Sequence, residues 1–158
     1  MWKKIKPYVI SILLALAVGG LSALFTMGNM QIYSEIETPS FAPPSILFPI
    51  VWTLLYILVG ISAAIIYTHR NDNFHEARCG LRSYSVSLIF NFFWSIIFFN
   101  IRWFGFAFFW LLGLLFFIIK TIVCYQRVNK LAAYLQIPYS LWVAFAGYLN
   151  FSIWMLNM

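Results

Sequence analysis

Tryptophans and asparagines are the residues of this chain best suited to chemistry inside its apolar segments. Trp52 and Trp142 carry indole rings, which stack on flat aromatic ligands and are readily oxidised. Radical or photo-oxidative chemistry at these rings is therefore conceivable. All four Asp and Glu residues and both His residues fall in predicted connections instead. This distribution argues against ordinary hydrolytic, kinase or dehydrogenase chemistry and against a proton relay of buried carboxylates.

The sequence predicts no metal site and no required cofactor. Cys79 and Cys124 lack the spacing of metal ligands and fall at the same predicted membrane face, so a disulfide framework is not expected either. His69 and His75 lie in a connection, where neither can ligate a haem iron inside a helix bundle.

The composition places these residues in a membrane protein. Of the 158 residues, 63% are hydrophobic and 9% are charged, whereas soluble domains carry about 25% charged residues. A helix needs about 20 apolar residues to cross a bilayer. We therefore predict an all-α integral membrane protein with a single domain over residues 1–158, a bundle of five transmembrane helices at about 7–27, 45–68, 83–100, 104–125 and 138–157.

The Lys and Arg residues predict the orientation of the bundle. Nine of them fall in three regions on one side: residues 3–6, residues 70–82 and residues 120–130. Arg102 stands alone on the other side. Because cationic loops remain in the cytoplasm, we expect a multi-pass protein of the cell membrane with a cytoplasmic N-terminus and an external C-terminus.

The loop over residues 28–44 is the only long connection on the outer side. It holds Glu35 and Glu37 but no Lys or Arg, and its prolines forbid a regular helix over most of its length. Long loops are often lids or binding loops. We interpret this one as a lid, with a passive tether as the alternative.

Polar and small residues share faces of the predicted helices at one depth beneath this loop. An asparagine inside a bilayer is costly without a partner, so Asn91 and Asn150 should point into the bundle. Their amides either hydrogen-bond across helices or orient a ligand in an apolar pocket, and both interpretations stay open. The residues that meet at this level are Trp52, Asn91, Trp94, Ala146 and Asn150, with Trp142 deeper on the same face as Ala146.

The first predicted helix carries a stripe of small residues, which permits close approach of another helix in lipid. The stripe serves either packing within the bundle or contact between two copies, and its members are Ser11, Ala15, Gly19 and Ala23.

Three spaced motifs resemble those of the TspO, or tryptophan-rich sensory protein, family, which includes the mitochondrial translocator protein. The loop and second helix read TPSFAPPSILFPIVWTLLYILVG, the third helix reads NFFWSIIFF and the fifth reads PYSLWVAFAGYLN. Two positions depart from the family pattern: Ile32 replaces a tryptophan before the loop, and Ser87 replaces a common glutamine.

The resemblance implies a five-helix bundle, often a homodimer, with a pocket under the first loop. It implies binding of tetrapyrroles such as protoporphyrin IX and haem, and of synthetic isoquinoline and benzodiazepine ligands. Carried over by position, the ligand-binding residues are Tyr33, Pro43, Trp52, Asn91, Trp94, Trp142, Ala146 and Asn150.

Three functions remain in competition at this point. The first is a membrane receptor or sensor for flat hydrophobic ligands, with the lipid bilayer and a porphyrin as partners and no nucleic acid. The second is a transporter of tetrapyrroles or sterol-like ligands, although no inverted repeat or coupling-ion residue is evident. The third is an enzyme that degrades protoporphyrin in light and oxygen, with Trp52 and Trp142 as its catalytic residues.

Overall fold

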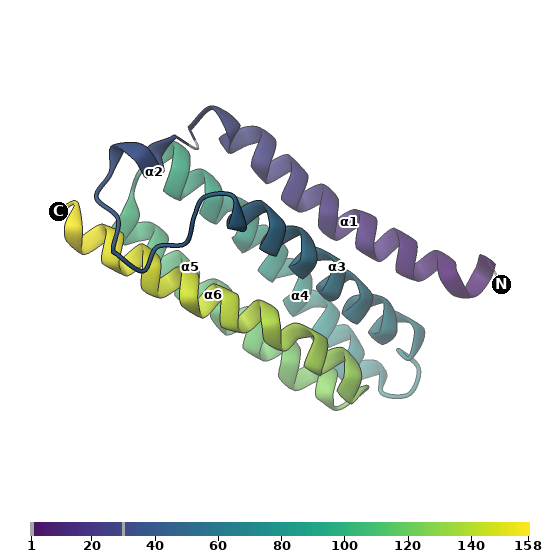
Figure 1. Ribbon diagram of the computed structural model, residues 1–158. Helices are drawn as coiled ribbons and strands as arrows, with labels where there is room; N and C mark the ends of the chain where they lie inside the picture. Colours follow the sequence, from purple (N-terminus) through teal and green to yellow (C-terminus); the bar gives the residue numbers. More distant parts are fainter. Residues whose placement is uncertain (1, 30) are drawn as a thin grey trace.

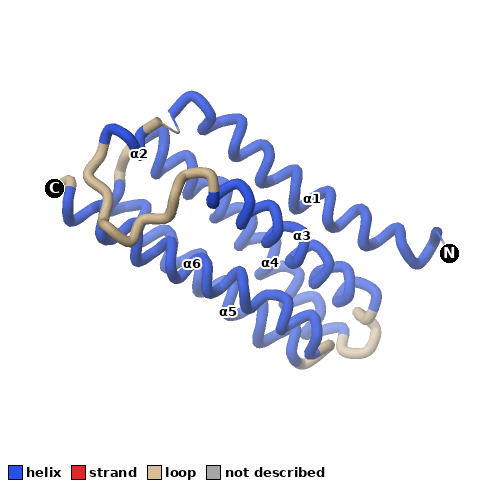
Figure 2. The backbone as a smooth tube through the Cα atoms, in the orientation of Figure 1, coloured by secondary structure: helices blue, strands red, loops and turns tan. Residues whose placement is uncertain are grey.

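Five long helices form a bundle in the computed structural model, which describes residues 2–29 and 31–158 (Figure 1). The long helices are α1 (Trp2–Thr26), α3 (Leu47–Thr68), α4 (Phe74–Ser95), α5 (Phe104–Gln126) and α6 (Lys130–Leu156). A 3-10 turn, η1 (Met27–Asn29), a short helix, α2 (Ile32–Glu35), and a π-helical segment, η2 (Ile96–Ile101), complete the described chain. No strand occurs in the described residues (Figure 2). The prediction of an all-α protein is confirmed.

The helices close into a ring in the order α1, α3, α6, α5, α4. α3 and α4 follow each other in the sequence but share a smaller contact than the pairs along the ring. The centre of the ring is filled by fully buried aliphatic side chains such as Leu111, Leu114 and Ile118 of α5. Large apolar side chains such as Leu14, Phe109 and Leu141 are exposed on the outside, as expected where lipid is the solvent.

Four segments are long and apolar enough to cross a membrane: Lys4–Glu35, Leu47–Thr68, Phe74–Ile101 and Phe104–Gln126. The fifth long helix, α6, is not among them, although the sequence analysis counted it as a span. α6 buries Gln136 and Asn150 in the bundle, and these polar residues lower its hydropathy without facing lipid.

Two helices begin well before the predicted apolar stretches, because a cap residue sets the start of a helix and hydropathy does not. α4 begins after Asn73, whose side chain accepts a hydrogen bond from the Glu76 amide at 3.4 Å. α6 begins after Asn129, whose side chain accepts one from the Ala132 amide at 3.2 Å. Pro138, predicted near the start of the last helix, therefore lies inside it.

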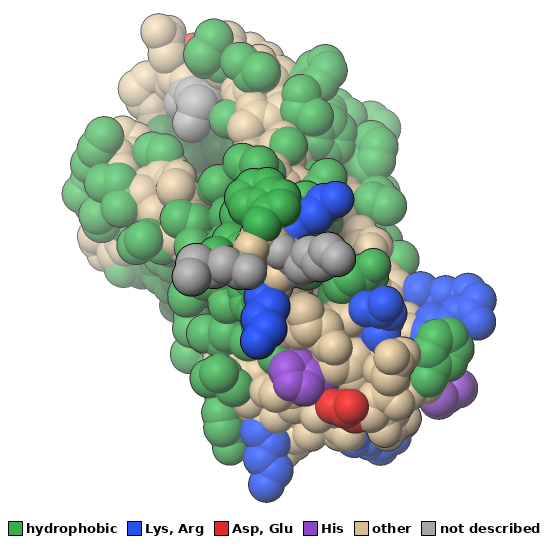
Figure 3. Space-filling view, turned by 90° about the vertical axis from the view of Figure 1, so that its right-hand side faces the viewer, with side chains coloured by type: hydrophobic (Ala, Val, Ile, Leu, Met, Phe, Trp, Pro, Cys, Tyr) green, Lys and Arg blue, Asp and Glu red, His purple; other side chains and the backbone are tan. Residues whose placement is uncertain are grey.

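The N-terminus and the α3–α4 and α5–α6 connections lie at one end of the bundle, and the C-terminus and the lid loop lie at the other (Figure 1). Lys and Arg side chains gather at the N-terminal end (Figure 3). The charge asymmetry of the sequence is thus also an asymmetry in space.

Candidate functional site

The lid end of the bundle contains a cavity of about 250 Å³ between α1, α3 and α4. Its walls are mainly apolar and aromatic. They combine small residues of α1, which leave the space open, with rings from α3, α4 and η2. The residues that line it are Leu16, Gly19, Gly20, Ser22, Ala23, Thr26, Phe48, Pro49, Trp52, Thr53, Tyr56, Asn91, Trp94, Ser95 and Phe99.

The Asn91 amide joins three helices beside this cavity. Its side chain is 2% exposed, and Nδ2 donates to the Tyr56 hydroxyl of α3 at 3.0 Å and to the Tyr139 hydroxyl of α6 at 3.2 Å. Asn91 therefore makes the cross-helix hydrogen bonds that one sequence interpretation predicted, and it also lines the cavity.

Asn150 of α6 links this helix to α4 and α5. Its Oδ1 accepts a hydrogen bond from Trp94 Nε1 at 3.2 Å, and its Nδ2 donates to the Phe104 carbonyl at 2.7 Å. The indole of Trp94 is thereby fixed by a buried partner. Asn150 itself does not line the cavity.

Trp52 is the centre of an aromatic cluster on the cavity wall. Its ring is stacked on Tyr56 with 5.7 Å between centroids, and it lies 6.5 Å from the Trp94 ring and 6.1 Å from the Tyr139 ring. Tyr56 and Tyr139 are in turn held by Asn91. Asn91 thus holds two of the rings against which Trp52 packs.

Trp142 and Ala146 lie on α6, outside the lining of this cavity. Trp142 meets Phe48 edge to face, with 6.0 Å between the ring centroids. Its indole Nε1 is buried and has no hydrogen-bond partner among the described residues. Ala146 is 5% exposed and packs in the bundle core. Trp142 therefore contacts the lining residue Phe48 but, like Ala146, does not line the cavity that Trp52, Asn91 and Trp94 share.

The loop over residues 28–44 covers the same end of the bundle. Tyr33 packs on Phe48, Phe98 and Phe99, with centroid distances of 5.4, 6.2 and 6.1 Å. Pro43 lies in the extended part of the loop, is half-buried and does not line the cavity.

Polar and aromatic contacts, in addition to the packing of Tyr33, hold this loop to the bundle. Glu37 and Asn157 form a reciprocal pair: the Glu37 amide donates to Asn157 Oδ1 at 3.0 Å, and Asn157 Nδ2 donates to the Glu37 carbonyl at 2.9 Å. Glu35 forms an ion pair with Arg102 at 3.0 Å. The Phe41 ring stacks on Tyr148 with 5.0 Å between centroids.

Several residues of the site were not singled out from the sequence. Phe48 lies inside a quoted motif, and its position before Trp52 on a helix could have suggested its role. Phe98 and Phe99 belong to η2, whose backbone departs from the α-helix and ends at Arg102 with a φ of 61°. No apolar pattern reveals such a π-helical turn, so the presentation of these rings required the structure.

The arrangement supplies flat aromatic surfaces, fixed by hydrogen bonds, in an apolar setting. None of the residues that line the cavity is Asp, Glu, His, Cys or Lys. Such a lining can offer stacking and burial of apolar surface, but no carboxylate, imidazole, thiol or amine for acid–base chemistry.

Comparison with known proteins places the chain among members of one family. The profile of the TspO/MBR family matches residues 11–155. The Tryptophan-rich protein TspO of Chlorobaculum tepidum is 36% identical over 99% of this chain and 99% of its own length. Protein CrtK of Rhodobacter capsulatus is 36% identical over 88% of this chain and 85% of its own. The Translocator protein of Bos taurus is 32% identical over 88% of this chain and 83% of its own.

Proposed function

This chain belongs to the TspO/MBR family of membrane proteins, and on that premise we propose that it is a receptor or sensor that binds flat hydrophobic ligands beneath its lid. The ligands proposed are chiefly tetrapyrroles such as protoporphyrin IX and haem. The observation that carries the proposal is the cluster of Trp52, Tyr56 and Trp94 rings on the wall of an apolar cavity. A planar ligand buried against such rings gains about 0.5–1.5 kcal/mol per stacked pair beyond the burial of its surface.

The cavity is smaller than a tetrapyrrole site. Its volume of about 250 Å³ lies below the roughly 300–1,000 Å³ of drug-sized ligand sites. Tetrapyrrole binding in this cavity therefore requires lining side chains such as the Phe48 ring to move. Displacement of Phe48 would join the cavity to Trp142, whose unpaired Nε1 could then donate to an acceptor on the ligand, and this would bring the α6 residues into the site.

The lining favours protoporphyrin IX over haem. No His, Cys or Met lines the cavity, and Tyr56, whose hydroxyl is the acceptor for Asn91, is the one lining residue of a type that ligates haem iron. Both ligands can stack on the rings of the cavity, but haem would find no strong axial ligand for its iron there.

We also propose that all five long helices span the membrane, with the N-terminus in the cytoplasm, and that two copies associate as a homodimer. The 27 residues of α6 extend about 40 Å at 1.5 Å per residue, which exceeds the hydrocarbon thickness of about 30 Å. Its polar residues Gln136 and Asn150 are buried against other helices. The gathering of Lys and Arg at the N-terminal end (Figure 3) supports the orientation.

A cavity-filling variant tests the ligand site. Ala17 and Ala23 are both exposed on α1, but only Ala23 lines the cavity. We expect Ala23→Trp to weaken protoporphyrin IX binding at least tenfold, which corresponds to a loss of about 1.4 kcal/mol in binding free energy. Ala17→Trp should leave the affinity unchanged. Quenching of tryptophan fluorescence by the porphyrin, calibrated for each variant, gives the affinity. Equal affinities for both variants would contradict binding in this cavity.

Light-dependent porphyrin degradation is the second candidate, because Trp52 faces the cavity and indole is readily oxidised. Trp52→Phe keeps an aromatic wall but removes the oxidisable ring. We expect this variant to bind protoporphyrin IX within about tenfold of the wild type and to form no product in light. Product formation at the wild-type rate would remove Trp52 from any catalytic role and leave receptor function alone.

A further inference from the structure

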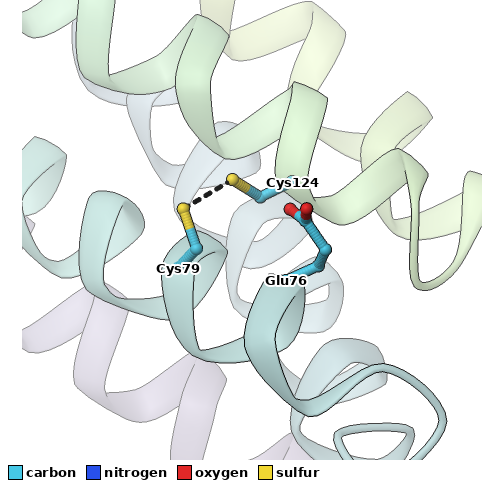
Figure 4. Close-up of side chains that lie close together, drawn as sticks. All are labelled: Glu76, Cys79 and Cys124. Carbon is cyan, nitrogen blue, oxygen red and sulfur yellow. Dashed lines mark hydrogen bonds between the residues drawn. The ribbon is translucent and has the colours of Figure 1, made fainter.

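Three candidate metal ligands meet at the N-terminal end of the bundle, away from the cavity. Glu76 and Cys79 lie one turn apart on α4, and Cys124 faces them from α5 (Figure 4). One carboxylate oxygen and the two sulfurs all lie within 4.8 Å of one another. The sulfurs are 2.8 Å apart, and both cysteines are free thiols. The sequence predicted that the cysteines share a membrane face, but it predicted no metal site.

Gly80 makes this meeting possible. A Cβ atom at Gly80 would lie 2.5 Å from Tyr125 Cδ1 and 3.2 Å from Cys124 Cβ. Any larger residue would push the end of α5 away from α4. The close approach of the two backbones brings Cys124 within reach of Cys79.

We propose that Glu76, Cys79 and Cys124 bind a thiophilic divalent cation of the Zn²⁺ type. Thiolate and carboxylate groups are both Zn²⁺ ligands, and three protein ligands leave a fourth tetrahedral position for water. Zn–S distances of about 2.3 Å require a separation of roughly 3.8 Å between two tetrahedral sulfurs. The sulfurs must therefore move apart by about 1 Å, a shift that rotation of the two cysteine side chains supplies.

With Arg127 included, the charges of the ion-bound site sum to zero. Two thiols each lose a proton, so two thiolates, one carboxylate and one divalent cation carry a net charge of −1. Arg127 stands next to them: its Nη1 donates to Glu76 Oε1 at 2.6 Å. The Glu76 side chain is 16% exposed and the Arg127 side chain is 62% exposed. Arg127 can thus hold the carboxylate, compensate the remaining charge and stay hydrated.

A disulfide is the competing chemistry of two neighbouring thiols. It would consume both sulfurs and exclude the metal, and it needs a two-electron oxidant. Disulfides are rare where glutathione and thioredoxin keep thiols reduced, and the proposed orientation places this end of the bundle in the cytoplasm. Metal binding needs only the ion and the release of two protons.

The test uses the full chain, purified in detergent and kept reduced with a phosphine. Titration with Co²⁺, a spectroscopic substitute for Zn²⁺, should produce a thiolate-to-cobalt charge-transfer band and the ligand-field bands of a tetrahedral ion. We expect one ion per chain, displacement of Co²⁺ by Zn²⁺, and release of about two protons per ion.

Single substitutions test which of the three side chains bind the ion. Cys79→Ser and Cys124→Ser should each weaken binding more than about tenfold and reduce the charge-transfer intensity, since even outer-shell partners contribute about 10- to 100-fold. Glu76→Gln should weaken binding but keep the charge-transfer band. Glu37→Gln, at the lid end, is the matched control and should bind like the wild type.

Alkylation provides a readout that does not depend on the stability of the variants. In the wild-type chain, stoichiometric Zn²⁺ should protect Cys79, the half-buried cysteine of the pair, from a maleimide, as measured by mass spectrometry of peptides. Absence of protection and of a charge-transfer band in fully reduced protein would overturn the proposal. Equal protection of Cys79 in wild-type and Glu76→Gln chains across the titration would remove Glu76 from the site. Protoporphyrin binding is not involved in either measurement.

Discussion

At the scale of single residues, the polar groups of the candidate site bind one another across helices. Asn91 bonds to Tyr56 and Tyr139, and Asn150 bonds to Trp94 and the Phe104 carbonyl. A buried amide in an apolar bundle needs such partners. The same bonds hold the Tyr56 and Trp94 rings, which line the cavity. The distinction between structural and ligand-orienting asparagines is therefore less sharp than the sequence suggested.

Replacement of Asn91 by Leu should destabilise the folded bundle. The change leaves the hydroxyls of Tyr56 and Tyr139 without the donor that they share. We expect a loss of about 1–2 kcal/mol in the free energy of unfolding, measured by thermal denaturation in detergent. Asn71→Leu, in an exposed connection, is the control. Unchanged stability combined with lost porphyrin binding would instead make Asn91 a ligand contact alone.

At the scale of elements, small residues determine how closely the helices approach. Ala15 of the small-residue stripe is fully buried, and a Cβ atom at Gly19 would collide with the Tyr56 ring at 2.2 Å. These members of the stripe therefore serve packing within the bundle. Gly60 plays the corresponding part on α3, where its missing side chain admits the backbone of Ile12.

Two glycine variants should change stability in opposite directions. A Cβ atom at Gly60 would lie 2.7 Å from Ile12 Cα, whereas a Cβ atom at Gly20 meets nothing within 4 Å. Gly60→Ala should destabilise the bundle by about 1–3 kcal/mol, because the backbone of α1 must move. Gly20→Ala should be neutral or stabilising by up to about 1 kcal/mol, because alanine favours a helix. Parallel denaturation of the two variants in one detergent gives the difference, and equal effects would contradict this packing.

The lid should open more often when its reciprocal pair is removed. Asn157→Ala deletes both hydrogen bonds to Glu37. Each bond contributes about 0.5–1.5 kcal/mol, so local opening should increase roughly tenfold or more. Hydrogen exchange over residues 36–44 measures this opening, and Asn71→Ala serves as the control. Exchange at the wild-type rate would mean that other contacts, such as the Glu35–Arg102 ion pair and the Phe41–Tyr148 stack, hold the lid without this pair.

At the scale of the whole molecule, the charge distribution predicts the orientation in the membrane. Nine of the ten Lys and Arg residues lie toward the N-terminal end of the bundle, and Arg102 lies at the lid end, where it pairs with Glu35. Because translocation of cationic loops is disfavoured, the lid end should face outward.

Cysteine labelling in intact cells measures that orientation. In a chain that lacks Cys79 and Cys124, a single cysteine is placed at Asn71 or at Thr38, both of which are exposed. An impermeant maleimide should label Thr38→Cys but not Asn71→Cys, and both should react after the cells are permeabilised. Labelling of Asn71→Cys alone in intact cells would reverse the topology.

The sequence by itself determined the class of the protein. Its apolar stretches and low charge require lipid as solvent, and local hydropathy is enough to locate four spans. Three spaced motifs indicated the family that the comparisons confirm. These properties depend on residue type and near neighbours, so they can be read along the chain. The sequence also predicted that Trp52, Asn91 and Trp94 lie in one site. The face of a helix on which a residue lies, and its depth in the membrane, follow from its position along the chain.

Only the tertiary structure decided which side chains touch. The packing of the helices leaves Trp142 in contact with Phe48 but outside the cavity lining. The π-helical turn at Ile96–Ile101 presents Phe98 and Phe99 to Tyr33. The meeting of Cys79 with Cys124 joins residues on different helices at a contact that Gly80 permits. Such contacts depend on the angle and spacing between packed helices, which arise from many side chains together and leave no periodic pattern in the sequence.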